Sequence, residues 1–167
     1  MSISRAITQS FFLIPMILLG SCDQQTANNQ TNPARITLGS NVHDKEFGNY
    51  IIHVNALTTD QLPTEIAQGY KITRSKNRAM MNISVREKQE NGEIPISASV
   101  NVVAKNLSNQ LKNVKLREIK DADPVAIYYI GELLVSHEET IVFDLDITPA
   151  GASKPVLLSY KQQFYTE

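Results

Sequence analysis

Cys22 is the residue with the clearest chemical potential in this 167-residue chain, because it is the only cysteine. A thiol is a strong nucleophile near neutral pH and needs little activation. It follows an apolar run, Phe11 to Leu19, and the two small residues Gly20 and Ser21. A single thiol cannot form an internal disulfide, so this arrangement favours a covalent modification of Cys22 at the end of a leader.

Residues 1–21 have the three parts of a secretory signal: a weakly positive start with Arg5, an apolar stretch, and small residues before the cleavage point. The apolar stretch is interrupted by Pro15 and is shorter than the roughly 20 residues of a membrane span. Together with Cys22, the ending resembles the lipobox of bacterial lipoproteins. The resemblance implies cleavage between Ser21 and Cys22 and lipid attachment at Cys22.

Residues 22–34 contain Gln, Asn and Thr with little to bury, which predicts a disordered tether after the lipidated Cys22. A dozen residues span at most about 40 Å, so we expect a folded domain over residues 35–167 close to its membrane. Asp23 resembles the inner-membrane retention signal of enterobacterial lipoproteins. We therefore expect the protein to lie at the periplasmic face of the cell envelope, on the inner membrane rather than the outer one.

The remaining chemistry-bearing residues do not form a recognisable motif. His43, His53 and His137 lie in different segments without a second ligand at metal-binding spacing. No nucleophile elbow and no phosphate-binding glycine loop are present in the sequence. We expect no metal, no cofactor and no enzymatic activity. A small periplasmic hydrolase with one of the three histidines as base remains an alternative.

One cluster of charged residues suggests a binding role. This basic run consists of Lys71, Arg74, Lys76 and Arg78. Alternate cations on an extended segment suit anionic headgroups or an acidic protein partner. The alternatives are a solvated face with a structural salt bridge, for instance from Arg78 to Glu132, or a protected sheet edge. The formal net charge of −1 does not fit a nucleic-acid-binding protein.

The elements that position these residues show a period of two, which indicates β-strands. A segment at 59–70, with Pro63 near its start and Gly69 near its end, predicts one short helix. About seven to eight strands separated by regular turns predict an all-β, immunoglobulin-like antiparallel β-sandwich, with a small β-barrel as the alternative. The predicted strands cover residues 35–38, 47–57, 81–86, 94–105, 114–120, 125–135, 141–147 and 156–164.

Four short runs occur in order along the chain: Asn55-Ala56-Leu57, Arg74-Ser75-Lys76-Asn77-Arg78, Ser136-His137-Glu138-Glu139-Thr140, and the ending Gln162 to Glu167. Together they resemble the bacterial family catalogued as domain of unknown function 4426, over residues 43–167. The resemblance implies a small exported β-rich domain of Gram-negative bacteria and no particular activity.

These observations predict a membrane-anchored periplasmic lipoprotein that acts as a non-catalytic binding or accessory module of unknown ligand. Its partners would be the membrane, through the N-terminal lipid, and a protein of the envelope. A chaperone-like component that binds exported chains by β-addition is a further alternative, and it predicts an exposed, uncharged edge strand.

Overall fold

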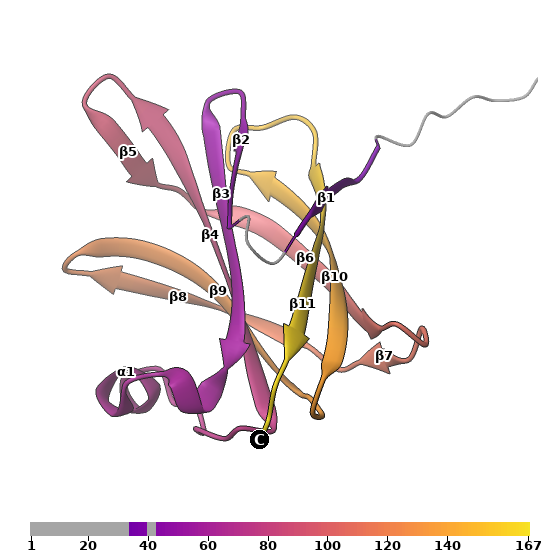
Figure 1. Cartoon of the computed structure of the whole chain (residues 1–167). Helices are drawn as coiled ribbons and strands as arrows, with labels where there is room; N and C mark the ends of the chain where they lie inside the picture. The colour runs from indigo at the N-terminus through magenta and orange to yellow at the C-terminus, as the bar shows by residue number, and fades with distance from the viewer. Residues whose placement is uncertain (1–33, 40–42) are drawn as a thin grey trace, which may run out of the picture. The chain divides into compact units, whose positions relative to one another are not determined.

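The computed structural model describes residues 34–39 and 43–167, which lie in one compact unit, Asn32–Glu167. Its regular secondary structure is nearly all β, with one short helix and one 3-10 turn among the described residues (Figure 1). The elements are β1 (Ile36–Leu38), β2 (Asp44–Phe47), β3 (Tyr50–Thr58), the 3-10 turn η1 (Thr59–Gln61), α1 (Thr64–Gly69), β4 (Arg78–Gln89), β5 (Gly92–Pro95), β6 (Ala98–Asn106), β7 (Leu111–Lys112), β8 (Lys115–Ala122), β9 (Val125–Leu134), β10 (Glu139–Pro149) and β11 (Val156–Phe164).

The strands form two open sheets. Sheet A has the order β1-β11-β10-β6-β7, and sheet B has the order β2-β3-β4-β9-β8 with β5 paired to β4. All pairs are antiparallel except β1 with β11, in which Thr37 lies opposite Ser159. The predicted β-sandwich with one short helix is confirmed, and the barrel alternative is wrong because neither sheet closes on itself.

Two predicted strands are each divided in the structure. The run expected at 47–57 begins as β2, turns at Gly48, whose φ of +56° favours glycine, and continues as β3. The run expected at 94–105 is split into β5 of sheet B and β6 of sheet A. β5 ends at Pro95, and after one more hydrogen bond, from the Ile96 N–H to the Val85 carbonyl, the chain crosses to sheet A. The described residues therefore hold more strands than the pattern indicated, although β4 and β10 extend beyond the runs predicted at 81–86 and 141–147.

The core lies between the two sheets. Sheet B contributes alternate residues of β3 and β4, such as Val54 and Ile83, and sheet A contributes residues of β10 and β11, such as Phe143 and Tyr160. All four side chains are fully buried. Alternation places the intervening residues on the opposite faces of the sheets.

A second, smaller apolar cluster lies on the outer face of sheet B. Helix α1 and the segments on either side of it contribute Leu62, Ala67 and Ile72, which pack with Met80 of β4 and Ile130 of β9. Consecutive residues of β4 thus serve different clusters: Met81 belongs to the core between the sheets and Met80 to the layer beneath α1. This helix covers only part of the outer face.

The predicted leader at 1–21 and most of the tether at 22–34, with Ser21, Cys22 and Asp23, lie outside the described residues. Within the described ranges, no helix has the length and apolar character needed to cross a membrane.

Candidate functional site

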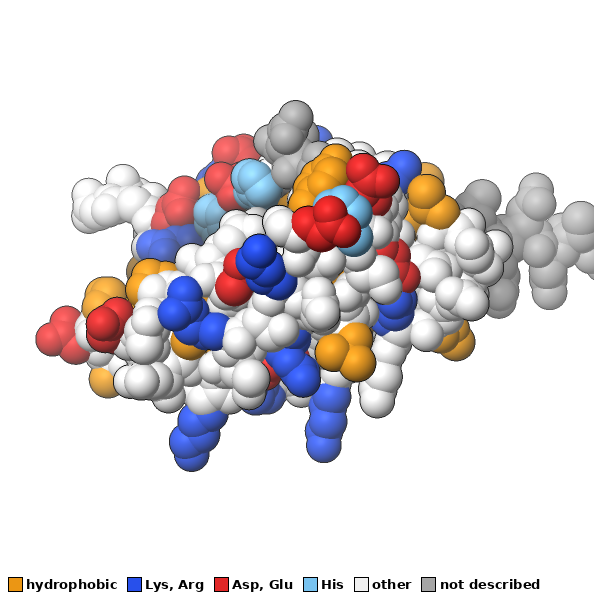
Figure 2. Space-filling model, turned by 60° about the horizontal axis from the view of Figure 1, so that its bottom comes forward, with side chains coloured by type: hydrophobic (Ala, Val, Ile, Leu, Met, Phe, Trp, Pro, Cys, Tyr) orange, Lys and Arg blue, Asp and Glu red, His pale blue; other side chains and the backbone are white. Residues whose placement is uncertain are grey.

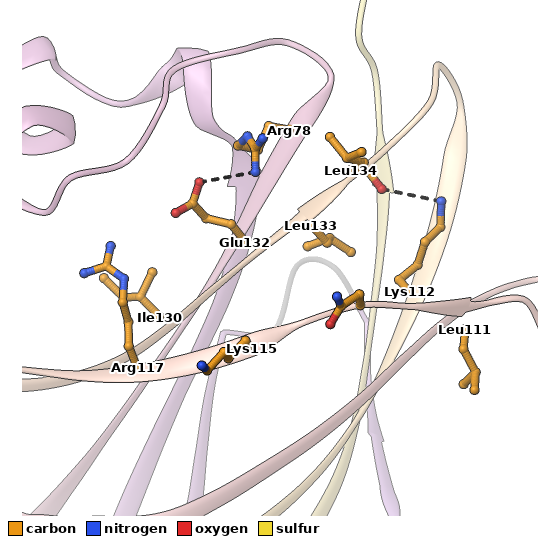
Figure 3. A pocket seen from close by; sticks show the side chains of 10 residues that line it. Arg78, Leu111, Lys112, Lys115, Arg117, Ile130, Glu132, Leu133 and Leu134 are labelled. Carbon is orange, nitrogen blue, oxygen red and sulfur yellow. Dashed lines mark hydrogen bonds and ion pairs between the residues drawn. The ribbon is translucent and has the colours of Figure 1, made fainter.

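A pocket of about 620 Å³ opens on the outer face of sheet B, next to β7 and β8 (Figure 3). We call it the cationic pocket because four of its side chains are Lys or Arg and one is acidic. Its lining residues are Arg78, Leu111, Lys112, Asn113, Lys115, Arg117, Ile130, Glu132, Leu133 and Leu134.

Strand register brings the charged groups of the pocket together. Lys115 and Arg117 are two residues apart on β8 and therefore share one face of the sheet. Lys115 lies opposite Glu132 and Arg117 opposite Ile130 on β9, while Arg78 of β4 lies opposite Leu134. In Figure 3, Arg117 rises beside Ile130, and Arg78 faces Glu132 across the upper part of the pocket.

Two of the four cations are matched by carboxylates. Arg78 Nη1 is 3.7 Å from Glu132 Oε2, the ion pair that the sequence suggested. Lys112 Nζ is 2.6 Å from Glu139 Oε1, with the two side chains only 21% and 13% exposed. In the part of the chain that the structure describes, Lys115 and Arg117 form no ion pair, and Arg117 donates a hydrogen bond to the Tyr70 carbonyl. The pocket thus carries two exposed, unmatched positive charges, which favour an anionic ligand.

Glu139 fixes the wall of the pocket on the side of β7. Its carboxylate accepts hydrogen bonds from the Ser136 backbone N–H and from the Asn106 amide, in addition to pairing with Lys112. Burial raises the pKa of this carboxyl, but the hydrogen bonds from Lys112, Ser136 and Asn106 outweigh burial and hold the pKa below its ordinary value. One residue therefore joins the β9–β10 turn to the end of β6 and to β7.

A second pocket, of about 310 Å³, lies between α1 and the outer face of sheet B. We call it the apolar pocket, since most of its lining side chains are apolar or aromatic. Asn82 Oδ1, on its wall, is buried and has no hydrogen-bond partner among the residues that the structure describes. The lining residues are Asn55, Leu57, Leu62, Ile66, Tyr70, Ile72, Met80, Asn82, Tyr128 and Ile130.

Tyr70 stands at the edge of the apolar pocket. Its hydroxyl donates a hydrogen bond of 2.5 Å to Asp121 Oδ2 at the end of β8. This hydrogen bond to a carboxylate, together with burial and the charge of Asp121, raises the pKa of Tyr70 to about 12. Tyr70 therefore stays protonated at physiological pH and ties the end of α1 to β8.

The structure places the four residues of the predicted basic run in different surroundings. Arg78 lines the cationic pocket. Arg74 has a structural role, since its guanidinium donates hydrogen bonds to the Asp60 carbonyl at 2.6 Å and to Thr64 Oγ1 at 3.0 Å. Lys71 and Lys76 are exposed in the loop between α1 and β4 and line neither pocket.

His43 and His53 lie on neighbouring segments, since the His43 carbonyl accepts a hydrogen bond from the Val54 N–H, whereas His137 lies in the turn between β9 and β10. His43 Nδ1 lies 3.3 Å from the Val54 carbonyl, and His53 Nδ1 lies 2.5 Å from Asp44 Oδ1 on β2. His137 accepts a hydrogen bond from the Thr166 backbone N–H and lines a shallow hollow beside the C-terminal segment. Among the described residues, no three His, Cys, Asp or Glu side chains are grouped to hold a metal ion.

Sequence reasoning missed Lys112, Lys115 and Arg117. The spacing of Lys115 and Arg117 in a predicted strand did place both cations on one face, and this was the available signal. Lys112 gave no such signal, because its strand is only two residues long. Lys115 and Arg117 are brought to Arg78 by the β8–β9 hairpin together with the pairing of β9 to β4, and only the latter joins strands that are distant in sequence.

Fold and site together define a small β-sandwich domain with a cationic pocket and an apolar pocket on one outer face. The family model described as "Domain of unknown function (DUF4426)" matches residues 44–167, and the chain belongs to this family. The crystal structure of a DUF4426 family protein from Pseudomonas aeruginosa PAO1 is similar, with a TM-score of 0.62 and 23% identity. The similarity covers 74% of this chain and 94% of that chain and concerns the fold. None of the curated proteins matches.

Proposed function

We propose that this protein is a lipoprotein of the bacterial cell envelope, a non-catalytic module that binds an anionic group of a ligand or partner in its cationic pocket. Lipid on Cys22 would hold the domain at the periplasmic face of a membrane, and Asp23 favours the inner one. The observation that carries the binding function is the pair of unmatched cations, Lys115 and Arg117, in one pocket.

The anchor is supported by the order of features in the sequence. An apolar leader, two small residues and the only cysteine come directly before a polar stretch, and the compact unit begins at Asn32. One acyl chain binds membranes only marginally, whereas two or more anchor a protein stably. A diacylglyceryl group on Cys22 with a further acyl chain on its amine would satisfy this requirement.

The chemistry of the cationic pocket supports binding over catalysis. Lys and Arg side chains keep their protons at neutral pH, so they serve as lasting positive charges and hydrogen-bond donors. Arg117 uses one of its N–H groups on Tyr70, which leaves the others for an anion. Figure 2 shows the end of the unit that carries α1 and the C-terminus, and Lys and Arg side chains predominate over the lower half of the view.

Site-specific photocrosslinking in cells would test the binding function. The crosslinker is placed at Leu134, which is 64% exposed on the rim of the pocket, and as a control at Val125, which is 65% exposed at the start of β9. We expect a discrete adduct from Leu134 that is lost in the Lys115→Gln, Arg117→Gln double variant. Equal adducts from both positions, or none from Leu134, would contradict the proposal.

The anchor has its own test. We expect Cys22→Ala to abolish incorporation of labelled palmitate and to move the protein from the membrane fraction to the soluble periplasmic fraction. Retention of label in this variant would place the lipid on another residue, and absence of label from the wild type would exclude lipidation.

One observation favours a second candidate function, capture of an extended polypeptide by β-addition. Strand β6 pairs with β10 along its whole length, whereas β7 covers only Ala104 and Lys105 on its other side. The segment 98–103 carries no charged residue, and Val103 is 52% exposed. Lysine on an edge strand prevents strand addition. If this function operates, Val103→Lys should abolish suppression of aggregation of an unfolded exported protein, and an unchanged effect would exclude it.

A further inference from the structure

We propose that the cationic and apolar pockets together bind one single-chain anionic amphiphile, with its charged head at Lys115 and Arg117 and its alkyl chain beneath α1. This inference rests on the proposed function, because the same cationic pocket receives the anionic group, and it adds the chemical class of the ligand.

The two pockets are neighbours that share a floor. Ile130 lines both of them. Strand register sets Asn82, Ile130 and Arg117 opposite one another in one row across β4, β9 and β8, with Asn82 in the apolar pocket and Arg117 in the cationic one. Adjacent strands are about 4.8 Å apart. A ligand that leaves Arg117 along this row therefore enters the apolar pocket within two strand spacings.

Arg117 lies between the cationic pocket and the apolar pocket. Its guanidinium donates to the carbonyl of Tyr70, and Tyr70 lines the apolar pocket. This contact orients the guanidinium over the junction of the pockets, while its remaining N–H groups stay available to a phosphate or carboxylate oxygen. Lys115 adds a second positive charge on the same face of β8.

The apolar pocket is suited to a chain. Its volume of about 310 Å³ falls at the lower end of the range of roughly 300–1,000 Å³ for small-molecule sites, which are mostly apolar with few polar groups. Ile66 on α1 lines this pocket and is 45% exposed, so the pocket is accessible from solvent. Leu57, Met80 and Tyr128 offer the apolar surface against which methylene groups would be buried.

Neither pocket alone predicts this ligand. An inorganic anion would use the cations and leave the apolar pocket empty, and a neutral hydrocarbon would leave Lys115 and Arg117 unmatched. An amphiphile satisfies both conditions, because burial of its chain is favourable and its head neutralises the charges. Carboxylate and phosphate heads share this chemistry, and the experiment below compares one probe of each kind, so that the tighter of decyl phosphate and decanoate identifies the preferred head.

Calorimetric titration of the full chain would test the inference, with Cys22→Ser introduced so that no attached lipid competes. The probes are decyl phosphate and sodium decanoate, hexyl phosphate as the shorter chain, decanol as the uncharged chain and inorganic phosphate as the charge without a chain. We expect one molecule of decyl phosphate per protein, bound at least tenfold more tightly than inorganic phosphate or decanol. Each added methylene should strengthen binding by up to about fourfold until the pocket is full.

Two matched pairs of variants locate the head and the chain. Lys115→Gln should weaken decyl phosphate at least fivefold, whereas Lys120→Gln, on the opposite face of the same strand, should leave it unchanged. Ile66→Glu should remove the gain from chain length, whereas Ile94→Glu should not, since Ile94 is equally exposed on β5 at 46% and lines neither pocket.

The outcomes separate this inference from the proposed function. If inorganic phosphate and decyl phosphate bind with equal affinity, and Lys115→Gln weakens both, the proposal of an amphiphilic ligand is wrong. The proposed anion-binding function would still be supported. Binding of decanol as tight as decyl phosphate and insensitive to Lys115→Gln would overturn the role of the cations. Binding to anionic vesicles without binding of monomeric probes would identify a membrane surface and overturn the pocket.

Discussion

The inner and outer faces of sheet B are built from alternating residues of the same strands, yet they differ in packing. On the inner face, Val54, Met81, Ile83 and Val85 are all fully buried against sheet A. On the outer face, apolar packing is confined to the area under α1, and two pockets and two unmatched cations remain. The filled face stabilises the fold, and the unfilled face has space and charge available for a ligand.

The largest difference should come from the two neighbouring methionines of β4. Met81→Ala removes a fully buried side chain from the core and should lower the free energy of unfolding by about 2–5 kcal/mol. Met80→Ala should cost roughly 1 kcal/mol, because its side chain borders a pocket that is already open and only part of its contacts are lost. Urea unfolding of both variants measures the contrast. Equal losses would show that the outer face is packed as tightly as the core.

Glycine substitutions sharpen the same comparison. A Cβ added at Gly131 on β9 would lie 2.6 Å from Val114 Cγ1 and 2.9 Å from Leu116 Cδ2, so Gly131→Ala should destabilise the protein by about 1–3 kcal/mol through overpacking. Gly69→Ala at the end of α1 meets nothing within 4 Å and should change stability by less than about 0.5 kcal/mol or raise it.

A compensating substitution checks the cause of the Gly131 effect. Val114→Ala removes the nearest methyl group, so the double variant should regain part of the stability that Gly131→Ala loses. Thermal unfolding of the two single variants and the double variant measures this. If the two losses of stability simply add, Gly131 acts through its backbone rather than through contact with Val114.

The two faces also differ in how far the sequence predicts them. Alternation of Met81, Ile83 and Val85 with polar residues identified the inner face, since a period of two is a local property of the chain. The Arg78–Glu132 ion pair was foreseen as one alternative for the basic run. Gly48 and Pro95 each divide a run that alternation alone presents as continuous.

The pockets could not be predicted in the same way. Lys115 and Arg78 come to line one pocket through the local hairpin of β8 and β9 and through the pairing of β9 with β4, and the second of these joins segments that are distant in sequence. The basic run was visible because its members are close in sequence, but the turns around Arg74 direct that side chain to Asp60 and Thr64. Proximity in sequence therefore drew attention to the basic run, whereas the cations of β8 could be placed beside Arg78 only from the pairing of β9 with β4.

Among the cations that line the cationic pocket, the matched Lys112 should matter for stability more than the unmatched Lys115. Its partner Glu139 has a lowered pKa in the folded state, so the carboxylate contributes stability that is present above its unfolded pKa and is lost as the pH falls through the folded value. Glu139→Gln should be less stable than wild type by roughly 1–2 kcal/mol at pH 7, with the difference shrinking below about pH 4.5. Thermal unfolding across pH measures this, and a difference that does not change with pH would contradict it.

The smallest effect on stability should come from Lys115→Gln. Lys112→Gln leaves the mostly buried Glu139 without its cation and should cost about 1–3 kcal/mol, whereas Lys115 is exposed and forms no ion pair with the described residues. Replacement of such a side chain typically changes stability by less than about 0.5 kcal/mol. Urea unfolding of the two variants side by side makes the comparison. If Lys115→Gln weakens decyl phosphate binding and leaves the free energy of unfolding unchanged, Lys115 serves ligand binding and not stability. A large loss of stability would instead make Lys115 a structural residue and remove the charge on which the site depends.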